Sequence, residues 1–174
     1  MEEFDLEQAD NREYVIDSVK KDGKLLEFAS ENLKNDKEIA KIAVNQNPVA
    51  LEFVSNKLKN DKEIVYSSVS KVGWTACYAS EKLRGDKELM LSGAKVDGQI
   101  LYYASKELRD DKDVVLQAVT NKGIILKYAS HRLREDKDVI LAAITQNKKA
   151  KEYIASEELL NDSDIQSILN PPQE

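Results

Sequence analysis

The stretch LKNDKEI occupies Leu33–Ile39, and the same seven residues occur again at Leu58–Ile64. Related copies follow at the same spacing of 25 residues, namely LRGDKEL from Leu83, LRDDKDV from Leu108 and LREDKDV from Leu133. A fixed spacing of roughly 20–50 residues is typical of proteins built from stacked structural repeats. The heptapeptide therefore predicts a tandem array of short structural units.

Further columns recur when the chain is aligned at this spacing. The aromatic column consists of Phe28, Phe53, Tyr78, Tyr103, Tyr128 and Tyr153. The alignment begins at Asn11 and continues, past a one-residue insertion near Ile154, to Asp162. We therefore expect an acidic N-terminal cap at 1–10, one repeat domain at 11–169 and a C-terminal tail at 170–174. The units are expected to start near residues 11, 36, 61, 86, 111, 136 and 162.

Each unit contains two apolar stripes with the spacing of a helix. In the unit from Asp61, the first stripe is Ile64, Val65, Ser68 and Val69, and the second is Ala76, Ala79 and Leu83. Gly73 lies between the stripes and is expected to close the first helix in the left-handed conformation. Helices this short are unstable alone and need neighbouring units. The sequence therefore predicts an all-α solenoid of six stacked short helix pairs and a C-terminal half-unit.

The recurring Asp directly precedes the first stripe of its unit. A short acceptor side chain at that position caps the free N–H groups of a helix start. The acidic residue two positions later lies in the first turn, where the helix dipole favours negative charge. The lysine between them is expected to pair with neighbouring carboxylates. The heptapeptide is thus interpreted as a helix start and not as a reactive site.

Composition limits the classes of function. Charged residues make up 33% of the chain and apolar residues 41%, a balance that suits an elongated body with much surface. The net charge of −6 argues against a general nucleic-acid binder, which needs a basic face. No apolar stretch approaches the ~20 residues of a membrane helix.

The start of the chain, MEEFDLEQAD, lacks the basic region and apolar run of a signal peptide. A single cysteine, Cys77, rules out an internal disulfide framework and fits a reducing compartment. We expect a cytoplasmic protein, or one secreted by a system that leaves no cleavable N-terminal signal.

Catalytic and metal-binding patterns are weak. The only histidine, His131, and the only cysteine, Cys77, lie 54 positions apart, which places them about two repeats from each other. Asp110, Asp111 and Asp113 offer three carboxylates to a hard cation, but no glycine-turned ligand loop follows them. Glycine-rich phosphate loops and Cys/His metal spacings are absent from the sequence. We predict no catalytic residues, no cofactor and no metal, and a protein that is not an enzyme.

One cation recurs in each repeat, at Lys34, Lys59, Arg84, Arg109 and Arg134. Such an edge could follow a polyphosphate or an acidic peptide. Each cation lies two residues from a capping Asp, however, so the favoured interpretation is a solvated edge that neutralises itself.

Columns that vary between units are free for recognition. On the second helices one variable ridge is polar at both ends, for example at Glu27 and Lys127. Its middle contains Trp74, Cys77, Tyr102 and Ile124, with Tyr66 as an addition from the edge of a first helix. Exposed aromatic residues grouped on adjacent units are typical of interfaces with partners. These five residues are the predicted partner-binding site; the alternative for Trp74 is local packing over a turn.

The segment KDVVLQAVTNKGIILKYASHRL at Lys112–Leu133 resembles a tandem repeat known as domain-of-unknown-function family 4116. The resemblance covers about residues 11–169. It implies an α-helical repeat protein of a kind often found in intracellular bacteria and protists, and it implies no activity and no site residues. The chain departs from the pattern at Pro48, at Lys148 and at the insertion near Ile154, which predicts distorted second and last turns.

These observations favour a non-catalytic scaffold that binds a protein partner through the variable ridge. One alternative is a secreted effector or host-interaction protein of an intracellular microbe, which is implied by the resemblance. Another is a nucleic-acid-associated protein that uses the basic edge. The partner, the biological process and the oligomeric state stay open.

Overall fold

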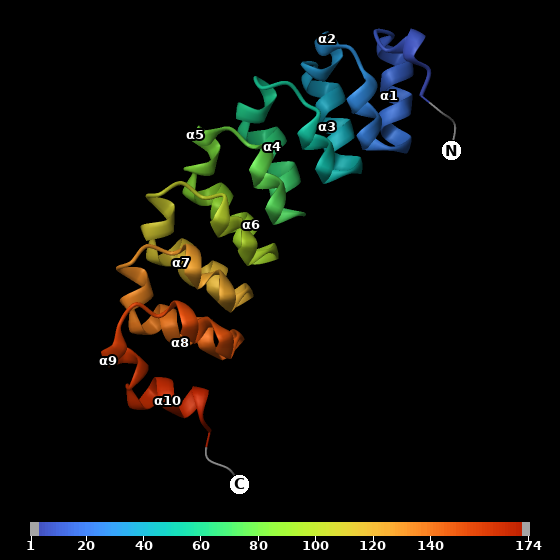
Figure 1. Cartoon of the computed structure of the whole chain (residues 1–174). Coiled ribbons are helices and arrows are strands. Elements are labelled where there is room, and N and C mark those ends of the chain that lie inside the picture. Colours follow the sequence, from blue (N-terminus) through green and yellow to red (C-terminus); the bar gives the residue numbers. More distant parts are fainter. Residues whose placement is uncertain (1–3, 172–174) are drawn as a thin grey trace. The chain divides into compact units, whose positions relative to one another are not determined.

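The computed structural model describes residues 4–171, and the secondary structure of this range is helical throughout, without strands. The chain forms two compact units, Met1–Leu83 and Arg84–Glu174, which meet within α5 (Glu81–Arg84). Within each unit the helices stand in a row in chain order (Figure 1). No helix of this range has the length and apolar character needed to cross a membrane. The prediction of an all-α fold is confirmed.

Unit 1 contains α-helices (α) and 3₁₀ helices (η) in regular succession. They are η1 (Leu6–Gln8), α1 (Arg12–Lys21), η2 (Gly23–Phe28), α2 (Glu31–Lys34), α3 (Lys37–Gln46), η3 (Pro48–Glu52), η4 (Leu58–Asn60), α4 (Lys62–Val69) and η5 (Gly73–Tyr78). Each repeat thus consists of an α-helix, a 3₁₀ helix and one short final turn.

Unit 2 follows the same order. Its elements after α5 are α6 (Lys87–Val96), η6 (Gly98–Tyr102), η7 (Leu108–Asp110), α7 (Lys112–Asn121), η8 (Gly123–Tyr128), η9 (Leu133–Glu135), α8 (Lys137–Gln146), η10 (Lys148–Tyr153), α9 (Glu157–Leu160) and α10 (Ser163–Leu169).

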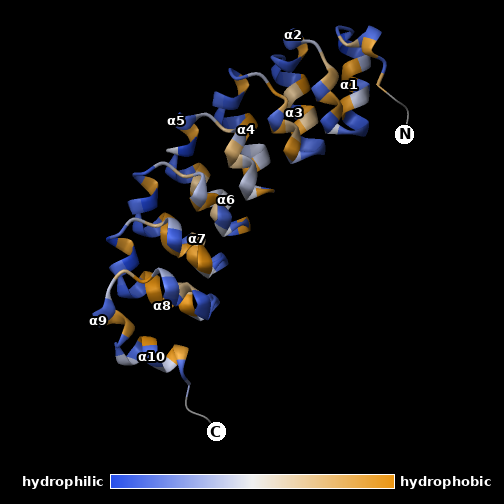
Figure 2. Cartoon of the chain, viewed as in Figure 1, coloured by the Kyte–Doolittle hydropathy of each residue, from blue (hydrophilic) through white to orange (hydrophobic). Residues whose placement is uncertain are grey.

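Side-by-side packing of the α-helices forms the core of each unit. In unit 1, α3 lies between α1 and α4, and in unit 2 the helices α6, α7, α8 and α10 follow one another. Hydrophobic and hydrophilic residues both occur along these helices, as expected of helices with one buried face (Figure 2). The first apolar stripe is fully buried in unit 1, including Ile64 and Val69. The solenoid arrangement predicted from the repeat is therefore confirmed.

The residues predicted to start the units all cap α-helices. These residues are Asn11, Asp36, Asp61, Asp86, Asp111, Asp136 and Asp162, and each side chain accepts a hydrogen bond from a backbone N–H group of the following turn. At Asp61, for example, Oδ1 accepts from the N–H of Glu63 at 3.0 Å and of Ile64 at 3.3 Å. The interpretation of the heptapeptide as a helix start is confirmed.

The lysine of the heptapeptide links one repeat to the next. In unit 2, Nζ of Lys112 lies 2.8 Å from a carboxylate oxygen of Asp136 and 2.7 Å from one of Asp138. Equivalent pairs of ion pairs join Lys37 to Asp61 and Glu63, Lys87 to Asp111 and Asp113, Lys137 to Asp162 and Asp164, and Arg12 to Asp36 and Glu38. Each of these cations therefore holds the cap and first turn of the following α-helix.

The role predicted for the recurring glycine is wrong. No residue of the described range has a positive φ, so none of these glycines closes a helix in the left-handed conformation. The glycine is required by close approach instead. A Cβ on Gly23 would lie 2.2 Å from the carbonyl oxygen of Ala43, and one on Gly123 would lie 2.1 Å from that of Ala143. The start of each of these 3₁₀ helices therefore packs directly on the backbone of the next repeat.

The second helix of the repeat is not continuous, in contrast to the prediction. Its stripe is buried as expected at Ala76, Ala79 and Leu83, but the backbone is extended at Ala79 (φ −69°, ψ 153°). The reason lies at the next residue, Ser80, whose N–H donates to the carbonyl of Lys59 in the preceding repeat at 2.9 Å. The Ser80 hydroxyl then accepts from the N–H of Leu83 at 3.3 Å and starts the final turn. Bonding to the neighbouring repeat thus replaces the bonds of a continuing helix.

The repeat that contains the insertion near Ile154 divides the two hydrogen bonds made by Ser80 in its own repeat between two residues. In the last repeat the N–H of Ala155 donates to the carbonyl of Arg134, and the hydroxyl of Ser156 caps α9. In the second repeat, where Pro48 replaces the glycine, the facing helix α4 ends after Val69 and has eight residues, whereas α3 has ten. The distortion predicted at the second turn is nevertheless absent, because the backbone at Asn47 (φ −141°, ψ 110°) and Phe53 (φ −93°, ψ −11°) around η3 matches that at Asp97 (φ −147°, ψ 108°) and Tyr103 (φ −93°, ψ −11°) around η6. In the last repeat the change lies after η10, at Ala155 and Ser156.

Residues 4–10 precede the first repeat and pack against it as successive repeats pack against one another. The buried ring of Phe4 packs on Tyr14 and Phe28, with ring centroids 5.2 and 5.5 Å apart, and the carbonyl of Ala9 accepts from Ser30. This segment is the described part of the predicted N-terminal cap. Residues 1–3 of that cap and 172–174 of the predicted tail lie outside the described residues, and the limits 11–169 of the repeat domain stay a prediction.

Candidate binding cleft

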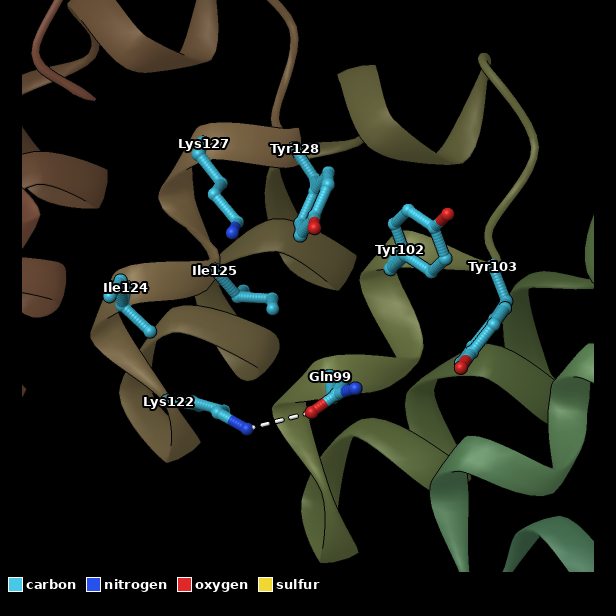
Figure 3. A pocket seen from close by; sticks show the side chains of 8 residues that line it. All are labelled: Gln99, Tyr102, Tyr103, Lys122, Ile124, Ile125, Lys127 and Tyr128. Atoms are coloured by element: carbon cyan, nitrogen blue, oxygen red, sulfur yellow. Dashed lines mark hydrogen bonds between the residues drawn. The ribbon is translucent and has the colours of Figure 1, made fainter.

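A cleft of about 200 Å³ opens in unit 2 between the 3₁₀ helices of two successive repeats. We call it the Tyr102 cleft (Figure 3). The η6 side contributes Gln99, Tyr102 and Tyr103, and the η8 side contributes Lys122, Ile124, Ile125, Lys127 and Tyr128. All eight residues therefore come from the variable half of the repeat and from the residues directly beside it.

Close packing of backbone brings the two sides of the cleft together. A Cβ on Gly98, at the start of η6, would lie 2.2 Å from the carbonyl oxygen of Ala118 and 3.0 Å from Cβ of Lys122. The N–H of Gly98 donates to Oδ1 of Asn121 at 2.8 Å. The recurring glycine thus places η6 against the end of α7, and Gln99 comes within reach of Lys122.

Aromatic rings form one wall of the cleft. The ring of Tyr102 meets that of Tyr128 edge-on, with centroids 4.8 Å apart, and that of Tyr103 in the same manner at 4.9 Å. Tyr102 is nevertheless 48% exposed, which is a large apolar area for a ring with two aromatic neighbours. The rings hold one another in place and leave a face of Tyr102 in contact with solvent.

Two lysines lie at the cleft without a carboxylate partner. Nζ of Lys122 donates to Oε1 of Gln99 at 2.8 Å, as Figure 3 shows, and Nζ of Lys127 lies 4.8 Å from the ring centroid of Tyr128. Within residues 4–171 neither ammonium group lies within 4.0 Å of an acidic side chain. The lysines that link successive repeats behave differently, since each of those contacts two carboxylates.

Lys122 also departs from the structural pattern of its own column. In four other repeats, the residue before the 3₁₀ helix is Asp22, Asn47, Asp97 or Asn147, and its side chain caps that helix. Lys122 occupies the same position before η8 and provides no side-chain cap. Loss of such a cap costs about 1 kcal/mol. The cation of the cleft therefore stands where the fold favours a short acceptor.

The five predicted partner-binding residues are divided between the units. Tyr102 and Ile124 both line the Tyr102 cleft of unit 2. In unit 1, Tyr66 is 42% exposed on α4, whereas Trp74 and Cys77 are half-buried on η5. The ring of Trp74 meets that of Tyr78 edge-on at 6.0 Å, as the local-packing alternative predicts.

Reasoning from the sequence misplaced one residue of the cleft and missed others. Lys127 was expected at the polar end of the ridge, yet it lines the cleft. Tyr128 was missed because it belongs to a constant column, which indicated a purely structural role. Lys122 was missed although the sequence carries a signal: it is a lysine in a column whose other members are Asp22, Asn47, Val72, Asp97 and Asn147.

Residues of the other candidate patterns contact neighbouring groups within unit 2. The guanidinium of Arg109, from the recurring basic column, turns inward and donates to the carbonyls of Ala104 and Tyr102 at 3.0 and 3.1 Å. Of the acidic cluster, Asp110 accepts from Ser130 and Arg132, while Asp111 and Asp113 bind Lys87. In the described part of the chain, no three His, Cys, Asp or Glu side chains gather as a metal site would require.

Comparison with known proteins gave one match. The model of the family described as domain of unknown function DUF4116 matches residues 11–59, 43–84, 61–109 and 111–154, in tandem. No curated protein and no solved structure matches the chain.

Proposed function

The chain belongs to the DUF4116 family of repeats, to which no function is assigned, and on this premise we propose that it is a non-catalytic module that binds a protein partner. The observation that carries the proposal is the Tyr102 cleft. It presents a half-exposed tyrosine, held by two aromatic neighbours, in a column where four other repeats have glutamate or lysine and one has Cys77.

The size and lining of the cleft support a protein ligand. Sites for cofactors and small molecules usually enclose ~300–1,000 Å³. The Tyr102 cleft, at about 200 Å³, matches one or two side chains of a partner. Its lining consists of tyrosine, isoleucine, lysine and glutamine side chains, a mixture of aromatic, aliphatic and basic groups that suits contact with the side chains of a partner.

The repeat architecture supports the same proposal. Each repeat is held by buried stripes, caps and inter-repeat ion pairs, so its exposed 3₁₀ positions are free to vary without loss of the fold. Aromatic anchors on a rigid support bind partners at a small cost in conformational entropy. The rings of Tyr102, Tyr103 and Tyr128 provide such an anchor.

Selection from a phage-displayed library of random 16-residue peptides on the immobilised full chain tests the proposal. We expect peptides whose binding falls about tenfold with Tyr102→Ala, as for an interface anchor worth about 1–2 kcal/mol. Val96→Ala is the matched control, because Val96 belongs to the same unit, is 47% exposed and does not line the cleft. Failure to select any peptide that depends on Tyr102 would contradict the proposal.

The unit 1 part of the predicted ridge can be tested with the same peptides. Trp74→Ala should weaken capture only if η5 contributes to recognition. A loss of several kcal/mol in the free energy of unfolding, with capture unchanged, would assign Trp74 to local packing against Tyr78.

A further inference from the structure

We propose that the partner segment bound by the Tyr102 cleft is an acidic peptide, in which an apolar side chain is flanked by carboxylates. The apolar side chain would pack on Tyr102, and the carboxylates would contact Nζ of Lys122 and Lys127. This inference rests on the proposed function and adds the chemistry of the ligand.

Charge complementarity is the first argument. The chain has a net charge of −6, and most of its exposed cations with described contacts are paired with carboxylates. The ammonium groups of Lys122 and Lys127 have only an amide oxygen and a ring face as partners. A carboxylate is a stronger partner than either of these groups, because both members of the pair are charged. The cleft is therefore a local positive site on an acidic protein.

The second and independent argument is that Lys122 provides no side-chain cap for η8. The backbone at Lys122 (φ −145°, ψ 90°) resembles that at Asp97 (φ −147°, ψ 108°), whose side chain caps η6. Aspartate would therefore serve the fold better than lysine at position 122. Val72, at the same position before η5, also lacks the cap, so the cation and not the missing cap distinguishes position 122, and such a departure from a local structural rule is expected at functional sites. The gain here is a cation that reaches across the cleft to Gln99.

The spacing of the two lysines matches an extended peptide. Lys122 precedes the first residue of η8, and Lys127 is the fifth residue of its six. Five residues of 3₁₀ helix rise about 10 Å. Two or three residues of an extended chain span roughly 7–10 Å. Two carboxylates that are two or three positions apart in the peptide can thus reach both cations.

Two parallel selections test the inference, one on the wild-type full chain and one on the double variant Lys122→Glu/Lys127→Glu. The probe is the phage-displayed library of random 16-residue peptides. Wild type should enrich peptides with Asp or Glu on both sides of an aromatic or aliphatic residue. The double variant should bind those peptides at least tenfold more weakly and should enrich Lys or Arg at the same positions.

A synthetic peptide from the wild-type selection, compared with its Asn/Gln-substituted form, gives the quantitative test by fluorescence anisotropy. We expect at least tenfold weaker binding of the substituted form. Circular dichroism establishes that the double variant is folded; if it is not, Lys122→Gln/Lys127→Gln replaces it, with the same expected loss.

The outcomes separate the inference from the proposed function. Peptides that depend on Tyr102 but carry no excess of Asp or Glu would overturn the inference and leave the proposed function standing. Absence of any peptide that depends on Tyr102 would overturn both. Binding of a single-stranded 20-nucleotide DNA with equal affinity and equal dependence on the two lysines would also overturn the inference, because charge alone would then explain the site.

Discussion

Glu52 and Tyr102 occupy the same position of the repeat, two periods of 25 residues apart, one in each unit. In unit 1 the carboxylate of Glu52 accepts a hydrogen bond from the hydroxyl of Tyr78 at 3.0 Å, so the junction between repeats satisfies its own polar groups. In unit 2 the ring of Tyr102 contacts Tyr128, which is the equivalent of Tyr78, and keeps an exposed face. The exchange of Glu52 for Tyr102 is thus one of the differences between a junction with an internal polar link and one with an open aromatic cleft.

The comparison shows where a repeat protein has freedom to change. The buried positions of both junctions are filled by small or aliphatic residues, and both use the same contacts between backbones of successive repeats. The junctions differ at some buried positions, such as Thr75 and its equivalent Ile125, and also at exposed positions of the 3₁₀ helices, where a new side chain disturbs no core contact. We infer that recognition in this chain arises from the second half of the repeat while the first half maintains the stack.

The largest expected effect tests whether the two units share one backbone design. Gly23→Ala in unit 1 places a Cβ 2.2 Å from the carbonyl oxygen of Ala43. Gly123→Ala in unit 2 places a Cβ 2.1 Å from the carbonyl oxygen of Ala143. Because that oxygen belongs to the backbone of the next α-helix, relief requires movement of the helix. We expect each variant to lose about 3 kcal/mol of unfolding free energy in urea denaturation.

Lys148→Ala is the control for the glycine variants, since position 148 belongs to the same column and already carries a Cβ. Its unfolding free energy should change by less than about 0.5 kcal/mol. A large loss at only one of the two glycines would show that the junctions of the two units differ in backbone, and the comparison would fail.

A second prediction concerns the caps, which should act alike in both units. Asp61→Ala and Asp111→Ala should each cost about 1 kcal/mol at pH 7 through loss of an N-cap, with little added by the exposed ion pairs. Urea denaturation measures the loss. A cost confined to one unit would contradict a common role for the Asp column.

The same variants predict a dependence on pH. The ammonium of Lys37 lowers the pKa of Asp61 against the opposing effect of burial. At Asp111 burial alone would raise the pKa, and the ammonium of Lys87 with the N–H of Val114 outweighs it. A carboxyl group with a lowered pKa stabilises the fold above its unfolded pKa of about 3.9 and loses this effect as the pH falls through its folded pKa. The difference between wild type and each variant should therefore shrink below about pH 4, and a constant difference would contradict the ion-pair assignment.

Local features of the fold could be predicted from the sequence, and features that depend on a neighbouring repeat could not. The Asp caps and the stripe at Ile64 and Val69 follow from interactions within one helix. The break at Ala79 arises because Ser80 bonds to the carbonyl of Lys59 in another repeat. Likewise the glycine column responds to a carbonyl twenty residues further along the chain, which no local rule for helix ends describes.

The cleft was predicted in part for a related reason. Tyr102 is an aromatic residue in a mostly charged column, and Ile124 belongs to a column of mixed polarity, so their variation was visible in the alignment of repeats. Tyr128 gives no such signal, because its column is aromatic in every unit, and its role in the cleft depends on the neighbour at position 102. Lys122 is the only cation in a column of Asp and Asn that Val72 also interrupts. A residue that differs from the rest of a structural column can therefore also mark a binding site.

The third prediction concerns Lys122, whose equivalent in the unit 1 junction is Val72 and also provides no cap. Lys122→Asp gives η8 the cap that Asp97 provides for η6 and removes a cation from the Tyr102 cleft. We expect a gain of about 1 kcal/mol in unfolding free energy. Peptides selected on wild type should bind this variant at least tenfold more weakly. Asp97→Ala, which loses about 1 kcal/mol, calibrates the cap in the same unit, and a destabilised Lys122→Asp would show that Lys122 serves the fold.

The smallest expected effect concerns the hydroxyl groups that distinguish the two junctions. Tyr78→Phe removes the donor to Glu52 and leaves the ring in contact with Trp74. Water replaces much of this hydrogen bond because Glu52 is exposed, so the expected loss is about 0.3 kcal/mol, below the ~0.5–1.5 kcal/mol of a typical intramolecular bond. Tyr128→Phe should cost nothing measurable, since the Tyr128 hydroxyl makes no hydrogen bond within the described residues. A double-mutant cycle of Tyr78→Phe with Glu52→Gln isolates the pair from other effects of either change. Coupling indistinguishable from zero in that cycle would mean that the polar link in unit 1 contributes nothing, and that the two junctions differ in surface chemistry but not in stability.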